Sequence, residues 1–287
     1  MSVFFGLATA FANALAVTTQ HIASTSDPKA SSGWRLVAYL LRHPLWLFGW
    51  LAMAGSLLFQ ALALHFGAMS LIQPLLVTEL ILALVLRRYW LHQTISGLAW
   101  ASATLTGAGL GLFFWAAAPR TSLDAVPSAA LWTRASLACA LGIVALVVLA
   151  LRGSPARRAG IFASATAIAW ALEAAYIKAT TDSISAHGVL GAFAHWPLYA
   201  LVVGGVIGLA CEQTALHVGP LSISQPFIVI VDPLVSVALG VWVYHEHVAT
   251  GALHHVLSTL GLLVMALGVA SLTKSAPATM QANGHHI

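Results

Sequence analysis

Charged residues are scarce in this chain. Only 7% of its 287 residues are Asp, Glu, Lys or Arg, whereas 60% are apolar, and the mean hydropathy is +0.90. An average soluble domain has about 25% charged and about 45–50% apolar residues. A soluble globule of this length could neither bury so much apolar surface nor cover itself with so few charges, and disordered chains are poor in apolar residues. The composition therefore predicts a polytopic membrane protein that has the lipid bilayer as its main partner.

Other absences exclude further classes of protein. The only two cysteines, Cys139 and Cys211, lie in apolar runs, so no disulfide framework is expected. The formal net charge is +4, but the twelve Lys and Arg form short scattered clusters, which argues against a nucleic-acid partner. No phosphate-binding loop, nucleotide fingerprint or nucleophile elbow occurs. We therefore expect no enzyme, no cofactor and no ATP-driven transport by this chain alone.

Nine apolar segments are long enough to cross the hydrocarbon core, which takes about 20 helical residues. We predict an all-α integral membrane fold with spans at 3–22, 45–65, 70–90, 95–116, 130–151, 159–178, 196–217, 221–243 and 250–271. A tenth span within 183–195 stays open, and residues 34–41 are expected to form a short interfacial helix. Nine of the twelve Lys and Arg lie on one side of these spans and three on the other. Because cytoplasmic loops are enriched in Lys and Arg, we place the N-terminus outside the cell membrane and the C-terminus in the cytoplasm.

The chain contains an internal repeat. Residues 63–74 (ALHFGAMSLIQP) and 215–226 (ALHVGPLSISQP) are identical at seven of twelve positions, with an offset of 152. Spans 1–4 (1–116) match spans 6–9 (159–272), the segment 117–158 holds a linker span and a basic loop, and 273–287 is expected to be a disordered tail. An odd linker span inverts the second repeat, and inverted repeats are common in secondary transporters that bind substrate where the halves meet.

The repeated motif carries a family resemblance. The pattern Ala-Leu-His-x-Gly-x-x-Ser-x-x-Gln-Pro before a long apolar helix resembles the drug/metabolite transporter superfamily. The nine-span layout, with Trp-Leu-Phe-Gly-Trp at 46–50, resembles its NIPA-like branch, which is associated with magnesium transport in eukaryotes. The stretch 219–226 and the Asp-Pro-Leu at 232–234 resemble EamA-like bacterial members of that branch. The resemblance implies transport, and it places Glu246 where the superfamily often has an acidic residue.

Four of the eight carboxylates fall inside predicted spans, where an ionised group usually faces a cavity or a partner. Asp232 is the first candidate for a proton or cation site, because Pro233 removes a backbone donor and is expected to kink the helix beside it. Glu79, near the middle of the repeat-related span, is the second, and these two are also the candidate metal ligands. The alternative for Asp232 is a structural hydrogen bond, and for Glu79 a packed, protonated acid.

Further polar residues predict a cavity lined by both halves. One face of the first span carries Asn13 and Gln20, and the related face of the sixth carries Trp170 and Glu173. Trp170 either stacks on a solute or packs as ordinary core, and Glu173 either lines the cavity or pairs with Lys178 or His21. The remaining candidates are Glu212, interpreted as a binding or gate residue, and the Gln73-Pro74 and Gln225-Pro226 pairs, which are expected to begin helices.

Three motifs have simpler interpretations. His65 and His217 end helices and are expected to be neutral caps. The segment His245-Glu246-His247 with His254-His255 is expected to be a hydrated loop, with a weak metal or proton sensor as the alternative. Gly107-x-x-x-Gly111 and Gly204-Gly205 with Gly208 predict close helix packing, either within the chain or in a homodimer.

The sequence therefore leaves three functions open. The first is a secondary transporter that moves a small solute by alternating access, coupled to protons through Asp232 or Glu79. The second is a divalent cation pathway for magnesium, with Asp232, Glu79 and Glu173 as ligands. The third is a membrane scaffold or receptor without transport.

Overall fold

The computed structural model describes residues 1–25, 43–90, 92, 94–120, 127–219 and 221–275, and the secondary structure in these ranges is helical apart from one isolated bridge. The helices are α1 (Ser2–Thr25), α3 (Pro44–Phe66), α4 (Met69–Leu76), α5 (Thr78–Tyr89), α6 (Gly97–Ala117), α7 (Ala129–Ala150), α8 (Pro155–Ala192), α9 (Trp196–Val218), α10 (Leu221–Val243) and α11 (Ala252–Ser275). The expected interfacial helix 34–41 and the tail from 276 onward lie outside the described residues.

The prediction of an all-α chain with nine spans is confirmed at the level of helix length and composition. Among the described residues, nine segments are long and apolar enough to cross a membrane, and they coincide with the predicted spans to within a few residues at most ends. The third is divided at Val77 into α4 and α5. The apolar stretch within 183–195 is no separate span, because α8 extends to Ala192 with a kink at Gly188 (φ +75°).

Serine side chains mark the starts of three consecutive helices. Ser96, Ser128 and Ser154 have extended backbones and accept the backbone N–H three residues later, at 3.2, 3.2 and 3.4 Å. Such caps satisfy one of the N–H groups that the first turn of a helix leaves without a partner. Polar residues between apolar runs therefore set where α6, α7 and α8 begin.

The two Gln-Pro pairs do not begin helices, so that expectation is wrong. Pro74 is the sixth residue of α4, and Pro226 is the sixth residue of α10, which also continues through Pro233. The physical reason lies upstream, because both helices already begin at the residue before the repeated serine, Ser70 or Ser222. A proline just beyond the first turn removes only one intrahelical donor.

The helices form two compact units. The first comprises residues 1–66 and 75–95, in which α1 packs against α3 and α5. A Cβ added at Gly49 of α3 would lie 2.7 Å from Gln20 Cγ and 2.8 Å from Thr19 Oγ1 of α1. Glycine at this position therefore allows α1 and α3 to approach closely.

The second unit comprises residues 67–74 and 96–287, and α8 lies at its centre, packed against α7, α9 and α10. The predicted close packing of the α9 glycines is confirmed. Gly204 faces Tyr176 of α8, Gly205 faces Glu173, and Gly208 faces Trp170 with a Cβ approach of 3.0 Å. Small residues on α9 thus make room for the large side chains of α8.

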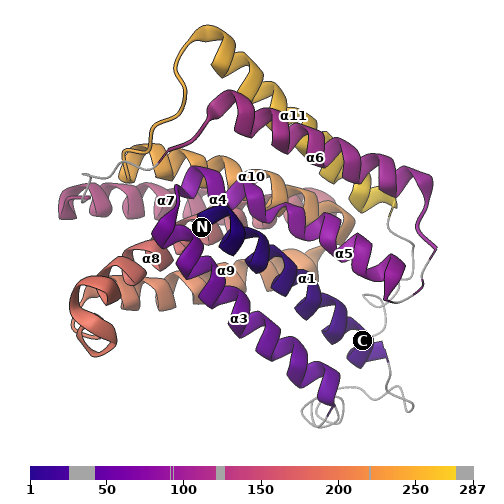
Figure 1. Ribbon diagram of the computed structural model, residues 1–287, viewed down its shortest axis with the longest axis horizontal. Coiled ribbons are helices and arrows are strands. Elements are labelled where there is room, and N and C mark those ends of the chain that lie inside the picture. The colour runs from indigo at the N-terminus through magenta and orange to yellow at the C-terminus, as the bar shows by residue number, and fades with distance from the viewer. Residues whose placement is uncertain (26–42, 91, 93, 121–126, 220, 276–287) are drawn as a thin grey trace. The chain divides into compact units, whose positions relative to one another are not determined.

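Helices α6 and α11 form a tightly packed pair in this unit and run side by side (Figure 1). A Cβ at Gly109 would lie 2.7 Å from the Gly261 carbonyl oxygen and would overlap the backbone nitrogen of Met265. A Cβ at Gly261 would lie 2.9 Å from the Gly109 carbonyl oxygen and 2.6 Å from the backbone nitrogen of Phe113. The contact between the two glycines is therefore reciprocal.

Gly111 of the Gly107-x-x-x-Gly111 motif makes no close helix contact within the described part of the chain. A Cβ at Gly111 would meet nothing within 4 Å, whereas Gly109 between the two motif glycines touches the backbone of α11. One helical residue turns by about 100°, so a shift of two positions moves the contact to another face of the helix.

Candidate functional site

Two carboxylates inside predicted spans come together in the second unit. Glu173 on α8 and Asp232 on α10 are close enough to interact electrostatically, and both are partly buried. Asp232 accepts a hydrogen bond from Ser236 Oγ, one turn along α10, at 3.0 Å. The structural hydrogen bond considered for Asp232 therefore exists, but within its own helix and not to a neighbouring one.

Glu212 on α9 contacts α8 about one turn before Glu173. Its carboxylate is hydrogen bonded to the Trp170 side chain, and Trp170 precedes Glu173 by one turn of α8. The Trp170 ring packs on Gly208 of α9, so ordinary packing describes its apolar part. Three helices thus contribute one carboxylate each, and none of the three forms a salt bridge with a basic residue in the described part of the chain. We name Glu173, Glu212 and Asp232 the acidic group.

Glu79 belongs to the first unit and has its own polar surroundings there. Its side chain is hydrogen bonded to Asn13 of α1, and Ser56 Oγ of α3 donates to Asn13 Oδ1. The predicted candidates Asn13 and Glu79 therefore meet, and Ser56, which the sequence analysis did not select, completes the network. Three helices of this unit are connected by polar groups at membrane depth, which is characteristic of functional sites.

The glutamine candidates differ in their surroundings. Gln20 Nε2 in the first unit and Gln73 Nε2 in the second are buried and have no hydrogen-bond partner among the described residues. Buried polar groups are nearly always hydrogen bonded, so each such amide calls for a partner other than the residues that the structure describes. The side chain of Gln225 lies outside the described part of the structure.

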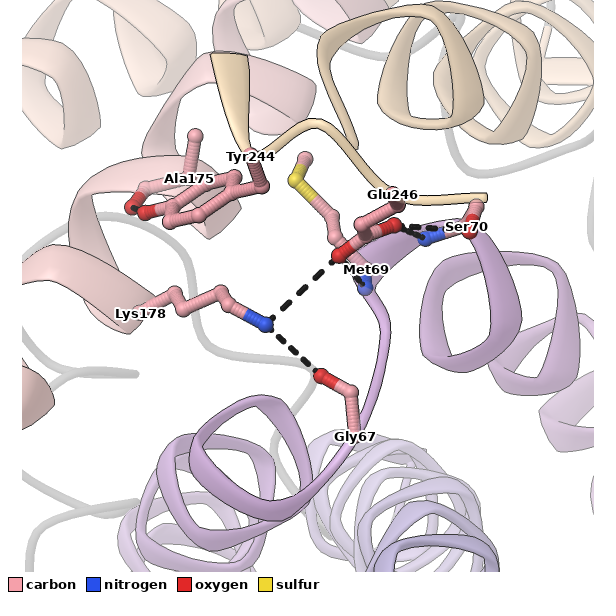
Figure 2. Close-up of polar contacts among 7 residues, drawn as sticks. All are labelled: Gly67, Met69, Ser70, Ala175, Lys178, Tyr244 and Glu246. Carbon is pink, nitrogen blue, oxygen red and sulfur yellow. Dashed lines mark hydrogen bonds and ion pairs between the residues drawn. The ribbon is translucent and has the colours of Figure 1, made fainter. Parts of the chain in front are cut away.

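A charged clamp lies at the N-terminus of α4 (Figure 2). Glu246 Oε1 accepts the backbone N–H of Met69 at 2.5 Å. Its Oε2 accepts the backbone N–H of Ser70 at 2.8 Å and the Ser70 hydroxyl at 2.7 Å. These donors belong to the first turn of a helix, whose N–H groups have no partner within the helix and where negative charge is favourable.

Lys178 of α8 supplies the opposite charge. Its Nζ lies 3.5 Å from Glu246 Oε1 and donates to the Gly67 carbonyl oxygen at 2.8 Å (Figure 2). The Tyr244 ring lies under the ammonium at 4.9 Å, and its hydroxyl donates to the Ala175 carbonyl oxygen at 2.7 Å. Burial raises the pKa of Tyr244 well above its usual value, so the phenol stays a neutral donor. We name Gly67, Met69, Ser70, Lys178, Tyr244 and Glu246 the α4 clamp.

The clamp corrects two expectations. Glu246 is not part of a hydrated loop, because only 3% of it is exposed, although His245 and His247 beside it are exposed. Lys178 pairs with Glu246 and not with Glu173. The sequence analysis missed this site because its members are spread from residue 67 to 246. The available signal was Glu246, an acid in an apolar chain where the superfamily resemblance places one.

The histidine-rich segment shows no metal site. No group of three or more His, Cys, Asp or Glu in the described residues could hold a metal ion. His247 instead joins a short backbone bridge, in which its N–H and C=O exchange hydrogen bonds with Arg120 at 3.0 and 2.9 Å. His65 and His217 lie in the last turns of α3 and α9, as predicted.

Comparison with known proteins finds a relative that matches along nearly the whole chain. The chain is similar to an uncharacterized protein of Corynebacterium glutamicum, with 26% identity over 284 residues that cover 96% of this chain and 95% of the relative. No protein-family model matches the chain. No solved structure matches it.

Proposed function

We propose that this protein is a secondary transporter that moves a small solute across the membrane, with proton coupling through membrane-embedded carboxylates. The observation that carries the proposal is the proximity of Glu173 and Asp232, two acids on helices long and apolar enough to span a membrane. Holding two such groups together without a basic partner is costly in a bilayer. Such an arrangement suits a site that exchanges a proton with a solute.

The packing of α6 on α11 supports an alternating-access architecture. Helices α6 and α11 are the fourth and the ninth span, which match each other in the two sequence repeats, and Gly109 and Gly261 make reciprocal contacts with each other's helix. Two equivalent elements that touch reciprocally are what a twofold-related pair of repeats would produce. Transporters with inverted repeats alternate between states by rocking one repeat against the other.

Magnesium is the second candidate substrate, and the same pair of acids favours it. Mg²⁺ keeps several waters in proteins and is usually bound through one or two carboxylates. Glu173 and Asp232 provide two carboxylates from different helices, and Ser236 adds a hydroxyl beside them. A magnesium pathway would use Glu173 and Asp232 as ligands, whereas a proton-coupled carrier would use them for proton exchange.

Flux through proteoliposomes tests both candidates. Wild-type protein and Asp232→Asn are reconstituted at equal density with a pH dye and a magnesium dye inside. Choline, ethanolamine, putrescine or magnesium chloride is then added outside. We expect Asp232→Asn to lose at least about 90% of the coupled flux, since an amide cannot exchange the proton, and loss of an essential proton-transfer group typically costs about 10²–10⁴-fold.

The matched control is Gln213→Ala, which changes an exposed side chain next to Glu212 and should leave flux unchanged. Magnesium entry without proton movement favours the cation pathway, and proton movement driven by an organic cation favours the coupled carrier. If Asp232→Asn transports like wild type at every pH, coupling does not run through Asp232.

A further inference from the structure

The α4 clamp joins three parts of the chain that are far apart in sequence. Lys178 comes from the middle of α8, Glu246 follows the end of α10, and Gly67, Met69 and Ser70 form the start of α4. All of these residues belong to the second compact unit. The clamp therefore decides where the first turn of α4 lies against α8 and the end of α10.

The clamp is buried and its charges are matched. The side chains of Lys178 and Glu246 are 8% and 1% exposed, both carboxylate oxygens accept backbone or hydroxyl donors, and the ammonium has a carbonyl and an aromatic ring besides its counter-ion. A buried ion pair of this kind adds little net stability compared with apolar residues of similar volume. Its best-attested use is to specify one arrangement over others.

The space for the carboxylate depends on Gly240. A Cβ at Gly240 would overlap Glu246 Oε2 and would lie 3.2 Å from the backbone nitrogen of Ser70. Any larger residue on this face of α10 would push the carboxylate away from the α4 N-terminus. Gly240 therefore offers a way to disturb the clamp without removing a charge.

One turn further along α4 lies a buried side chain, Gln73, that the clamp does not bind. Gln73 is 4% exposed, and its amide nitrogen has no hydrogen-bond partner among the described residues. A buried donor without an acceptor is satisfied once the segment moves and water or solute reaches it. The clamp thus holds α4 in an arrangement in which the polar groups of Ser70 are hydrogen bonded to Glu246, whereas the side-chain amide nitrogen of Gln73 has no partner among the described residues.

We propose that the α4 clamp is the latch of one gate, and that the start of α4 is the element that moves when this gate opens. The inference rests on the proposed transport function, because a gate has a role only in a protein that passes a solute. Opening breaks the contacts of Glu246 with Met69, Ser70 and Lys178 together. Because all of them end on one carboxylate, displacing that carboxylate releases them together, which suits a two-state switch.

Accessibility of a reporter cysteine, introduced as Ala68→Cys, tests the latch without any transport measurement. Ala68 is 3% exposed and lies between Gly67 and Met69, which both belong to the clamp. The full-length variant in nanodiscs is treated with a membrane-impermeant maleimide, and labelled peptides are quantified by mass spectrometry. When Glu246→Gln is added, we expect the reporter cysteine to be labelled at least about tenfold faster. The substitution removes the charge from the clamp, and hydrogen bonds to a charged group are among the stronger ones. Gly240→Ala should act in the same direction with all charges retained.

Two controls separate gate opening from unfolding. The native Cys139, buried in α7, should stay unlabelled in every variant that remains folded. His247→Ala changes an exposed neighbour of Glu246 and should leave the labelling rate of the reporter cysteine unchanged. The reporter cysteine could be labelled at the same rate whether residues 246 and 240 are native or carry Glu246→Gln or Gly240→Ala. That result would overturn the latch. Labelling that rises at the reporter cysteine and at Cys139 together would also overturn it.

A different measurement tests the transport proposal. Faster labelling of the reporter cysteine together with absent proton and magnesium flux in wild-type proteoliposomes would leave the latch standing and reject transport. Wild-type flux together with unchanged labelling would reject the latch alone.

Discussion

Gly109→Ala should destabilise the protein, whereas Gly111→Ala, two residues away on the same helix, should not. A methyl group at Gly109 would overlap backbone atoms of Gly261 and Met265, which cannot rotate away as a side chain can. Overpacking of this kind costs about 1–3 kcal/mol. At position 111 a Cβ meets nothing within 4 Å, and replacing a helical glycine with alanine gains about 0.5–1 kcal/mol.

The two substitutions are chemically identical. Opposite changes in the free energy of unfolding would therefore report on the contact between α6 and α11. Thermal unfolding can be followed with a thiol-reactive dye, because Cys139 and Cys211 are buried in the folded protein. Gly261→Ala should reproduce the effect of Gly109→Ala. The double variant should cost less than the sum, because the two residues share one contact. Equal melting temperatures for Gly109→Ala and Gly111→Ala would contradict the reciprocal packing.

Glu246→Ala should cost more stability than Lys178→Met, although the two residues form one ion pair. Without Glu246, the backbone N–H groups of Met69 and Ser70 lose their acceptor, and the buried Lys178 ammonium keeps only the Gly67 carbonyl and the Tyr244 ring. Breaking a buried pair in this way costs about 3–5 kcal/mol. Without Lys178, the carboxylate still accepts three hydrogen bonds at the start of α4, so we expect a loss of only about 1–2 kcal/mol.

Exchanging the two charges tests this reasoning further. The double variant Lys178→Glu with Glu246→Lys restores an ion pair but points an ammonium at the N–H groups of α4, which can only donate. It should therefore unfold at a lower temperature than Lys178→Met, whereas Glu246→Asp should keep most of the stability. A charge exchange that restored wild-type stability would show that the ion pair alone matters and that the helix N-terminus does not.

The sequence predicted the helices well and their contacts less well, for a physical reason. The apolar runs are long and are separated by polar links, so length alone located nine spans. The contact face of a helix depends on single residues about 100° apart, and in an apolar chain the pattern does not distinguish lipid-facing from protein-facing positions. This is why Gly107 and Gly111 were selected, and the contact at Gly109 was not.

The candidate site was predicted in part. Asn13 with Glu79, and Trp170 with Glu212, were selected as polar residues in apolar surroundings, and the structure brings each pair together. Their partners were not predictable, because Ser56 is inconspicuous among the small residues of α3. Glu246 was assigned to a loop because histidines flank it, but its side chain turns inward while theirs remain exposed.

The clamp also makes the two repeats chemically unequal. The residue equivalent to Glu246 at the offset of 152 is Thr94, which carries no charge. In the transporter proposed above, an acid in one repeat and a neutral hydroxyl in the other would give the two gates unequal opening free energies. The resting population would then be biased toward one orientation, and solute would be bound with different affinity from each side. Such a bias would give the proposed transport cycle a preferred starting point even when the solute concentrations are equal.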